Sequence, residues 1–353
     1  MSLAFYISGH GYGHASRQIE IINAIARAAP SLPVLIRSAA ERRLFDRTVN
    51  AAFELDSRPC DTGVVQIDSL RLDAAATIDR AAAFYRTLDA RAAEEAGLLR
   101  SRGVRFVVSD APPLACAAAA RAGIPSVVVS NFTWDWIYAE YREYLDAAPA
   151  LIPSIQAAYH LATEAWRLPM HGGFDTFRTR VIDTPFVARH AAYAPAETRL
   201  RLGLPLDRKL ALPSFGGYGV NGVDLDSLDL DRSWHLVRVP DAAIYDAGLR
   251  YVDLVKAVDV VVTKPGYGII SECIANGTAL VYTPRGRFAE YPVLVREMPR
   301  YVRCAFLNNE SLLAGRWRGA LDAAVAAPPP PVSPRTDGAE VIADMIAALV
   351  SSA

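Results

Sequence analysis

The feature that most constrains the fold is a unit in which an apolar strand, a glycine-rich turn and a helix follow one another. It occurs three times: residues 3–8 lead into the turn 9–13, residues 209–214 into 215–219, and residues 258–263 into 264–268. Short apolar runs separated by helices are typical of parallel sheets that are buried on both faces. The sequence therefore predicts an α/β fold.

Because the unit recurs in both halves, we expect two domains. At about 150 residues per domain, the 353 residues suffice for two. The first half closes with an apolar segment at residues 181–187, and the pattern resumes after residue 198. We expect two doubly wound, Rossmann-like domains that face a central cleft.

Composition excludes several classes of protein. The 37 Lys and Arg residues nearly balance the 38 Asp and Glu residues, so a strongly basic nucleic-acid binder is not expected. The four cysteines are widely spaced and form no C-x-x-C pair, which argues against zinc and redox motifs and fits a reducing cytosol. The start of the chain lacks a signal-peptide pattern, and no stretch is a good membrane span. We expect a cytoplasmic location, and association with a membrane stays open although nothing in the sequence supports it.

The first glycine turn resembles two nucleotide-binding motifs without completing either. A dinucleotide-binding fingerprint needs G-x-G-x-x-G, but after Gly9 and Gly11 the third position is His14. The acid expected after the second strand is replaced by Arg37, so a nicotinamide cofactor is not expected. A P-loop needs a Gly-Lys pair, and the chain contains none.

The third turn resembles the nucleotide-sugar motif of GT-B glycosyltransferases. Residues 263–272 read TKPGYGIISE and residues 275–279 read ANGTA, similar to the family's G-x-x-x-x-E…G-x-P, with Ala279 in place of the proline. The chain is similar to the lipid II-forming N-acetylglucosaminyltransferases. It is still more similar to the glycosyltransferase-like N-terminal half of plant-type L-arabinokinases, which carries turns like GHGYGH at 9–14 and segments like NFTWD at 131–135. Their kinase half has no counterpart here.

The resemblance implies a division of labour between the domains. Residues 1–187 would form the acceptor-binding domain and residues 188–335 the nucleotide-sugar-binding domain. Residues 336–353 would be a terminal helix that packs back on the first domain.

The resemblance also implies a donor site in the second half. Glu272 matches the acid that accepts hydrogen bonds from the ribose hydroxyls, although a carboxylate near a helix start is also explained by the helix dipole. Arg285 lies where it could neutralise phosphate charge, and an ordinary ion pair with Glu290 is the alternative. The predicted donor-binding residues are Gly216, Gly217, Tyr218, Lys264, Gly266, Tyr267, Gly268, Glu272, Arg285 and Glu290.

His14 is the predicted general base, because it matches the histidine that ends the family's first glycine loop. Imidazole titrates at about pH 6.5, which suits removal of a proton from an acceptor at neutral pH. Asp110 follows the strand at residues 104–109 and fits the partner that fixes the imidazole tautomer. A histidine that only shapes the loop is the alternative, and His10 is the second candidate.

Acceptor contacts are predicted on the first domain. Trp134 and Asp135 combine an aromatic face with a carboxylate, which suits a sugar, but packing between the domains is an equal explanation. Arg17 would face either the cleft or solvent, and Arg37 would meet an acid group or form a loop ion pair. The predicted acceptor-binding residues are His10, Gly11, Tyr12, Gly13, Arg17, Arg37, Trp134 and Asp135.

These expectations describe an inverting, metal-independent glycosyltransferase. The nucleotide diphospho-sugar would be its substrate, the acceptor a small molecule or glycan with a hydroxyl or amine, and no cofactor or nucleic acid is expected. Two alternatives keep the same fold. One is a nucleotide-sugar sensor without turnover, and the other is a nucleotide-sugar epimerase, for which no clear set of carboxylates is visible.

Overall fold

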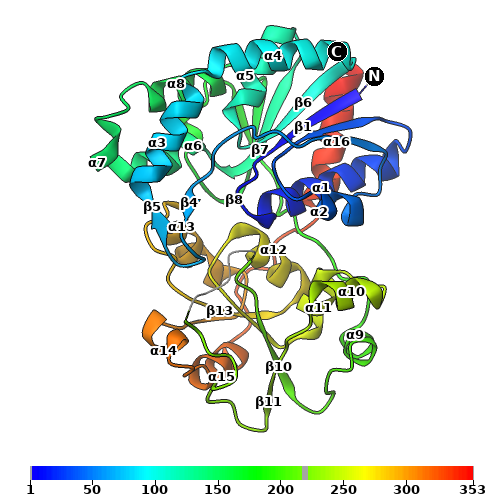
Figure 1. The fold of residues 1–353 in the computed structure, drawn as a ribbon. Coiled ribbons are helices and arrows are strands. Elements are labelled where there is room, and N and C mark those ends of the chain that lie inside the picture. The colour runs from blue at the N-terminus through cyan, green and yellow to red at the C-terminus, as the bar shows by residue number, and fades with distance from the viewer. Residues whose placement is uncertain (1, 217–221, 353) are drawn as a thin grey trace.

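The first structural unit is built on a parallel seven-stranded sheet (Figure 1). The computed structural model describes residues 2–216 and 222–352. The strands run in the order β3-β2-β1-β6-β7-β8-β9, and every neighbouring pair is parallel. Their bounds are β1 Ser2–Ile7, β2 Val34–Arg37, β3 Phe53–Asp56, β6 Val104–Asp110, β7 Ser126–Phe132, β8 Glu164–Gly172 and β9 Arg180–Asp183.

Helices cover both faces of this sheet, which is why its central strands are almost wholly apolar. One face packs against α1 (Tyr12–Ala28), whose residues Ile19, Ile22 and Ile25 join the core. The opposite core receives residues from the helical segments between β5 and β8. Those segments are α3 Ala74–Tyr85, α4 Leu88–Ser101, α5 Pro113–Ala122, α6 Trp134–Tyr138, η1 Ala139–Tyr141, α7 Arg142–Leu145 and α8 Leu151–Tyr159.

The second unit is a parallel five-stranded sheet in the order β11-β10-β12-β13-β14. Its strands are β10 Lys209–Pro213, β11 Trp234–Leu236, β12 Val260–Thr263, β13 Ala279–Tyr282 and β14 Cys304–Phe306. Its helices are α9 Pro195–Arg201, α10 Asp241–Asp246, α11 Tyr251–Ala257, α12 Tyr267–Asn276, α13 Glu290–Glu297, η3 Met298–Arg300, α14 Asn309–Leu313 and α15 Arg318–Ala326. The two sheets confirm the predicted α/β class with two Rossmann-like units.

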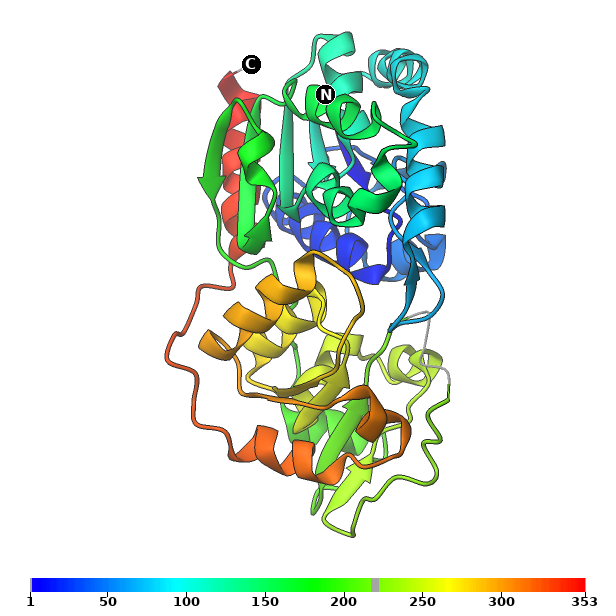
Figure 2. The ribbon, with the colours of Figure 1, turned by 90° about the vertical axis from the view of Figure 1, so that its left-hand side faces the viewer.

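The last helix, α16 (Gly338–Ser352), lies on the first unit. The segment after α15 runs up the edge of the second unit, and α16 then packs beside the N-terminal sheet (Figure 2). Ile342 and Ile346 share a core with Ile19 and Ile22 of α1. The chain therefore crosses between the units twice.

A two-stranded hairpin of the first unit reaches the second one. It consists of β4 (Val65–Gln66) and β5 (Leu72–Asp73), and both ribbon views show it extending toward the lower unit (Figures 1 and 2). The hydroxyl of Ser69 donates to the carbonyl of Phe215 at 2.6 Å, and Leu70 packs against the core of the second unit. This contact closes one side of the space between the units.

Candidate active site between the two units

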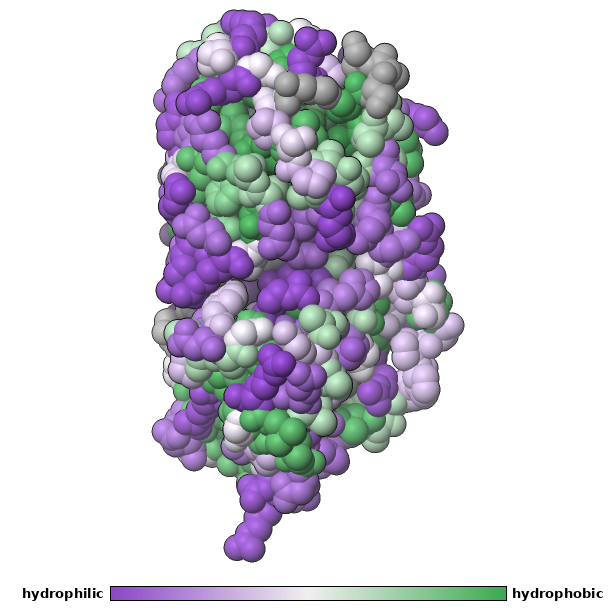
Figure 3. Space-filling view, turned by 90° about the vertical axis from the view of Figure 1, so that its right-hand side faces the viewer, coloured by the Kyte–Doolittle hydropathy of each residue, from purple (hydrophilic) through white to green (hydrophobic). Residues whose placement is uncertain are grey.

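The main cavity lies between the two units and has a volume of about 690 Å³. It opens at the carboxyl ends of both sheets, where open α/β sheets bind their ligands. The first unit contributes the β1–α1 turn and the start of α2 (Arg42–Thr48), and the second contributes residues around β10, β12 and α12. On the face that carries α2 and α10, hydrophilic residues gather across the middle of the molecule (Figure 3).

The two predicted glycine turns meet across this cavity. A β-carbon on Gly268 would lie 3.2 Å from Cα of Gly13, so position 268 has little room for a side chain, whereas one on Gly13 would make ordinary contact with Gly268 at 3.9 Å. Gly11 has a φ of +77°, a conformation that residues with side chains rarely adopt. The glycines therefore allow the two backbones to approach closely, with the start of α1 facing the start of α12.

His14 and Asp110 form the predicted pair. Nδ1 of His14 lies 2.8 Å from Oδ2 of Asp110, and the carboxylate is completely buried. Burial would raise the pKa of Asp110, but Arg17 and His14 outweigh it and hold this pKa below its ordinary value. An ionised carboxylate can only accept, so in the neutral imidazole this contact assigns the hydrogen to Nδ1 and the lone pair to Nε2, with Nη2 of Arg17 also 3.0 Å from Nδ1. His14 lines the cavity, so it can act there as a base.

His10 is prepared for the opposite role. Its Nδ1 accepts a hydrogen bond from the backbone N–H of Val64 at 3.3 Å, which leaves the hydrogen of the neutral ring on Nε2. Burial, His14 and the nearby cations lower the pKa of His10 well below its ordinary value. The ring of His10 stacks on Phe288 with centroids 6.0 Å apart. His10 is thus a neutral hydrogen-bond donor, which favours His14 as the base.

Cationic groups gather at the start of α12. This helix begins without a side-chain cap, so its first N–H groups face the cavity lined by Gly266 and Gly268. Burial, together with the Arg285 guanidinium, lowers the pKa of Lys264 to about 7. Nε of Arg285 is buried without a hydrogen-bond partner among the described residues. Two half-buried basic side chains beside free helix N–H groups favour an anionic ligand.

Glu272 lies farther along α12 and has a partner that the sequence did not reveal. Its Oε1 accepts from Nε of Arg189 at 2.7 Å, and both side chains line the cavity. Arg189 lies in the segment between β9 and α9. Apolar and aromatic residues complete this end of the cavity: Leu212, Val237, Val239, Tyr245, Tyr251, Leu254 and Ile269.

The other predicted donor residues fall partly on the cavity wall. Gly216, Tyr267, Arg285 and Glu290 line it, whereas Gly217 and Tyr218 lie outside the described residues. Nη1 of Arg285 donates to Oε2 of Glu290 at 3.0 Å. This is the ion pair that the sequence left as an alternative, and here it faces the cavity.

Three predicted acceptor residues do not line the cavity, unlike His10, Gly11, Tyr12, Gly13 and Arg17. Trp134 is fully buried, where its Nε1 donates to Asp61 at 2.8 Å and its ring packs beside His10 and His14. Asp135 is buried and accepts from Gln156 at 3.2 Å. Trp134 therefore packs against the two histidines inside the first unit, and these contacts of both residues lie within that unit rather than between the domains.

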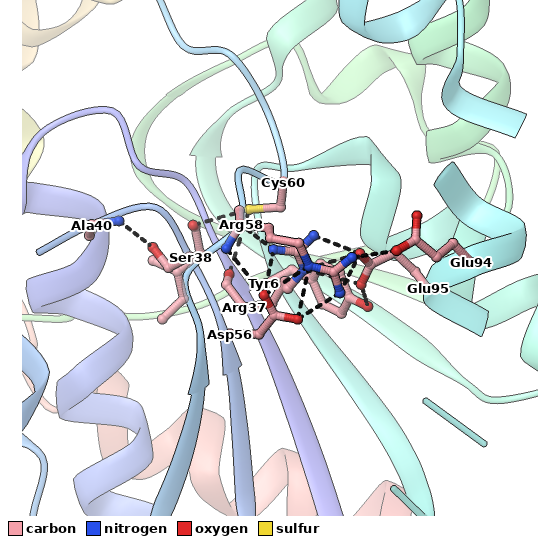
Figure 4. A network of polar contacts seen from close by, with 10 residues as sticks. Tyr6, Arg37, Ser38, Ala40, Asp56, Arg58, Cys60, Glu94 and Glu95 are labelled. Atoms are coloured by element: carbon pink, nitrogen blue, oxygen red, sulfur yellow. Dashed lines mark hydrogen bonds and ion pairs between the residues drawn. The ribbon is translucent and has the colours of Figure 1, made fainter. Parts of the chain in front are cut away.

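Arg37 belongs to a separate polar network (Figure 4). Its guanidinium donates to Glu95 at 2.7 Å and to Asp56 at 3.2 Å, and the side chain is buried. Tyr6 donates to the other oxygen of Glu95 at 2.8 Å. The positive charge of Arg37 is therefore paired with carboxylates of the first unit. The ion-pair alternative describes Arg37 better than a contact with the acceptor.

Sequence reasoning missed Asn131, Gln66 and Arg189. Asn131 lies near the carboxyl end of β7, and this place at a strand end was the signal that could have found it. Gln66 accepts from Nζ of Lys264 at 3.3 Å, but it lies in the hairpin region, whose sequence shows no clear pattern.

A smaller cavity of about 370 Å³ lies between α6–η1 and residues 286–292, and Phe288 lines both cavities.

Among residues 2–216 and 222–352, no group of three or more His, Cys, Asp or Glu side chains is arranged to hold a metal ion. No helix in these ranges is both long and apolar enough to cross a membrane.

Comparison with known proteins shows one clear relative in sequence. The chain is 31% identical to L-arabinokinase of Arabidopsis thaliana over 92% of its own length. It spans only 32% of that protein's length. No protein-family model matches the chain.

Solved structures with the same architecture are glycosyltransferases. The calicheamicin glycosyltransferase CalG4 has a TM-score of 0.62 at 15% identity, with 99% of this chain and 98% of that chain covered. A UDP-glucosyltransferase from Polygonum tinctorium has a TM-score of 0.59 at 13% identity, with 100% and 99% covered. The glycosyltransferase VinC in complex with dTDP has a TM-score of 0.53 at 13% identity, with 99% and 95% covered. The chain therefore has the GT-B fold.

Proposed function

We propose that this chain, which has the fold of nucleotide-sugar glycosyltransferases, transfers a sugar from a nucleotide diphospho-sugar to an acceptor hydroxyl or amine. The observation that carries the proposal is the placement of two complementary groups on opposite walls of one cavity. The His14–Asp110 pair lies on the first unit, and the cationic start of α12 lies on the second. A base and an anion site in one cavity are what sugar transfer from a diphosphate requires.

The donor would lie along the wall formed by the second unit. Its diphosphate would bind at the start of α12, between Lys264 and Arg285, and its ribose would reach the carboxylate of Glu272. The nucleobase would enter the apolar end near Tyr251, and the sugar would extend toward Glu290. This arrangement would use the apolar and the charged residues that line the same cavity.

Transfer would proceed by a single displacement with inversion. Nε2 of His14 would take the proton of the acceptor hydroxyl while the acceptor oxygen bonds to the anomeric carbon. The bond from that carbon to the phosphate oxygen would break, and the nucleoside diphosphate would leave with the electron pair. Lys264, Arg285 and the helix N–H groups would stabilise its charge, so the step needs no metal ion. His10 would donate a hydrogen bond near the reacting atoms.

The first test is nucleotide binding. A nucleoside diphosphate or nucleotide-sugar present at a hundred times its Kd should stabilise the protein by about 2.7 kcal/mol. We expect one series among uridine, thymidine, guanosine and adenosine nucleotides to raise the melting temperature. Replacing Glu272 with Ala should weaken the binding of that nucleotide by about 10- to 100-fold, because charge-assisted hydrogen bonds to the ribose are lost.

Two further variants make the Glu272 result interpretable. Glu272→Gln keeps a side chain that can accept from the ribose and from Arg189, so its effect should be smaller. Glu197→Ala removes an exposed ion pair with Arg201 on α9 and should leave binding unchanged. If no nucleotide binds, the proposed function fails. If one binds tightly but no transfer to any acceptor is found, the sensor alternative gains support.

The affinity for a nucleotide-sugar should fall as the pH rises from 6 to 8. The pKa of Lys264 is about 7 in the empty cavity, so at pH 8 most molecules must take up a proton before the ammonium can pair with the diphosphate. Linkage then gives a decrease of about tenfold across this range. A nucleotide-sugar is the right probe, because a free terminal phosphate itself titrates at about pH 6.

The pH dependence should disappear when residue 264 no longer titrates. Lys264→Arg should bind at all pH values with little change, and Lys264→Gln should bind weakly at all of them. Isothermal titration calorimetry at three pH values measures this directly. A wild-type affinity that stays constant from pH 6 to 8 would show that Lys264 does not contact the diphosphate.

A further inference from the structure

A chain of buried hydrogen bonds crosses the cleft and joins the donor wall to the His14–Asp110 pair. It starts at Arg285, passes through Glu290 to Asn131 of the first unit, and continues through Arg17 to Asp110. The contacts are 3.0 Å from Arg285 to Glu290, 2.7 Å from Asn131 to Glu290 and 2.6 Å from Arg17 to Asn131. Nε of Arg17 donates to Oδ1 of Asp110 at 2.9 Å.

The amide of Asn131 can occupy this place in only one orientation. Its Oδ1 accepts from the Arg17 guanidinium, and its Nδ2 donates to the Glu290 carboxylate. Turning the amide over would set its NH₂ group against a guanidinium and its oxygen against a carboxylate. Asn131 is completely buried, so the loss of either partner would leave a buried polar group unsatisfied. The side chain therefore fixes the positions of Arg17 and Glu290 relative to each other.

Arg17 in turn fixes the carboxylate that holds the base. It binds Oδ1 of Asp110, while His14 takes Oδ2, so the two residues divide the carboxylate between them. Arg17 also donates to Ser130 at 3.1 Å, and its guanidinium lies 5.4 Å from the ring centroid of Tyr267 in the second unit. Only 4% of Arg17 is exposed. Its position depends on both units, although it lies on the same helix as His14.

We propose that Asn131 and Arg17 are positioning residues that couple the seating of Glu290 on the donor wall to the orientation of the His14 imidazole. This inference rests on the proposed function, because it gives Glu290 the end of the cavity assigned to the donor sugar. When the two units close, Asn131 bonds to Glu290, Arg17 is held, and Asp110 presents Oδ2 to His14. When the units separate, Asn131 loses Glu290 and Arg17 loses the ring of Tyr267, so Arg17 holds the Asp110 carboxylate less firmly in place.

The test changes which of the hydrogen-bonded residues 131 and 290 carries a negative charge. Asn131→Asp keeps the contact with Arg17 but places a second carboxylate against Glu290. Glu290→Gln, which retains an acceptor for the amide of Asn131, is tested alone and together with Asn131→Asp. In the double variant the new carboxylate can accept from Gln at position 290, and the total charge equals that of the wild type. Asn308→Asp adds the same charge at the cap of α14, far from the cleft, and is the matched control.

The first readout is the imidazole signal of His14 in the side-chain ¹⁵N–¹H spectrum of the full chain. The chain has six histidines, and the variants His14→Gln and His10→Gln identify the signals of these two. We expect wild type to show a hydrogen-bonded Nδ1–H at His14, Asn131→Asp to shift or broaden it, and the double variant to restore it. A purely structural role would lower the melting temperature of Asn131→Asp and leave this signal unchanged, which would overturn the proposal.

The second readout is nucleotide-sugar affinity across the same four proteins. Asn131→Asp should weaken binding about tenfold in the wild-type background and about threefold or less in the Glu290→Gln background, which is the coupling expected of two side chains in contact. Equal effects in the two backgrounds would contradict the proposal. Because the spectrum needs no ligand, its outcome tests the coupling even if no nucleotide binds and the proposed function itself fails. If Asn131→Asp does not fold, the Glu290→Gln variant alone must shift the His14 signal.

Discussion

Turnover should fall about 100- to 10,000-fold when His14 is replaced by Ala, the range expected for loss of a general base. The imidazole is held by the buried Asp110 with its Nε2 lone pair available in the cavity. The donor residues lie on the other unit, so nucleotide binding should persist. Steady-state kinetics with the nucleotide identified by thermal shift, together with calorimetry for donor affinity, separates the two effects.

The control for this variant is a histidine outside the cavity. His171 lies at the end of β8, where its ring packs on Phe174 with centroids 6.0 Å apart. His171→Ala should leave turnover within about twofold of wild type, as is usual for surface substitutions away from a site. Full activity in His14→Ala would transfer the role of base to another residue, with His10 the first to examine.

The second large effect concerns Asp110 and the stability of the first unit. Asp110→Ala leaves the guanidinium of Arg17 buried without its main carboxylate partner, and such a change costs about 3–5 kcal/mol. Asp110→Asn keeps an acceptor for Arg17 and should cost less. Urea unfolding monitored by circular dichroism measures the free energy of unfolding of both variants. An unchanged slope of free energy against urea concentration shows that these values can be compared with that of the wild type.

The same pair predicts how stability responds to acid. The pKa of Asp110 is lowered in the folded protein, so its ionised form stabilises the fold above the ordinary pKa of an aspartate. This stabilisation is lost as the pH falls through the lowered pKa, and Asp110→Ala should lose less stability than wild type over that interval. Asp183→Ala removes an exposed pair with Arg167 and should cost no more than about 1 kcal/mol. If Asp110→Ala also lowered the free energy of unfolding by only about 1 kcal/mol, Arg17 would have found another partner.

The sequence predicted the parts of the site that depend on local order. A strand followed by a glycine turn and a helix places the turn at the carboxyl end of a sheet, so Gly11, Gly13 and Gly268 were found from their positions. His14 and Asp110 were predicted as a pair from the family resemblance, and the structure brings them together because β1 and β6 are neighbouring parallel strands. Lys264 and Glu272 were found through a motif contained in a single strand–turn–helix unit.

Side chains whose partners are distant in the sequence were harder to assign. Arg37 follows a strand like a ligand-binding residue, but Glu95 and Asp56 surround it inside the first unit. Trp134 has the composition of a sugar platform, yet burial makes it a support for the two histidines. The hairpin at residues 65–73 contains too few residues per strand for a periodic pattern to appear.

The sequence by itself determined the strands, the glycine turns and the residues at their ends, because these depend on apolar runs and on backbone conformations that only glycine adopts easily. Only the tertiary structure decided which charges face the cavity and which are satisfied elsewhere. Asn131 and Glu290 are 159 positions apart and lie on different units. Their contact exists because closure of the two units buries both groups, and a buried polar group must find its partner wherever the fold provides one.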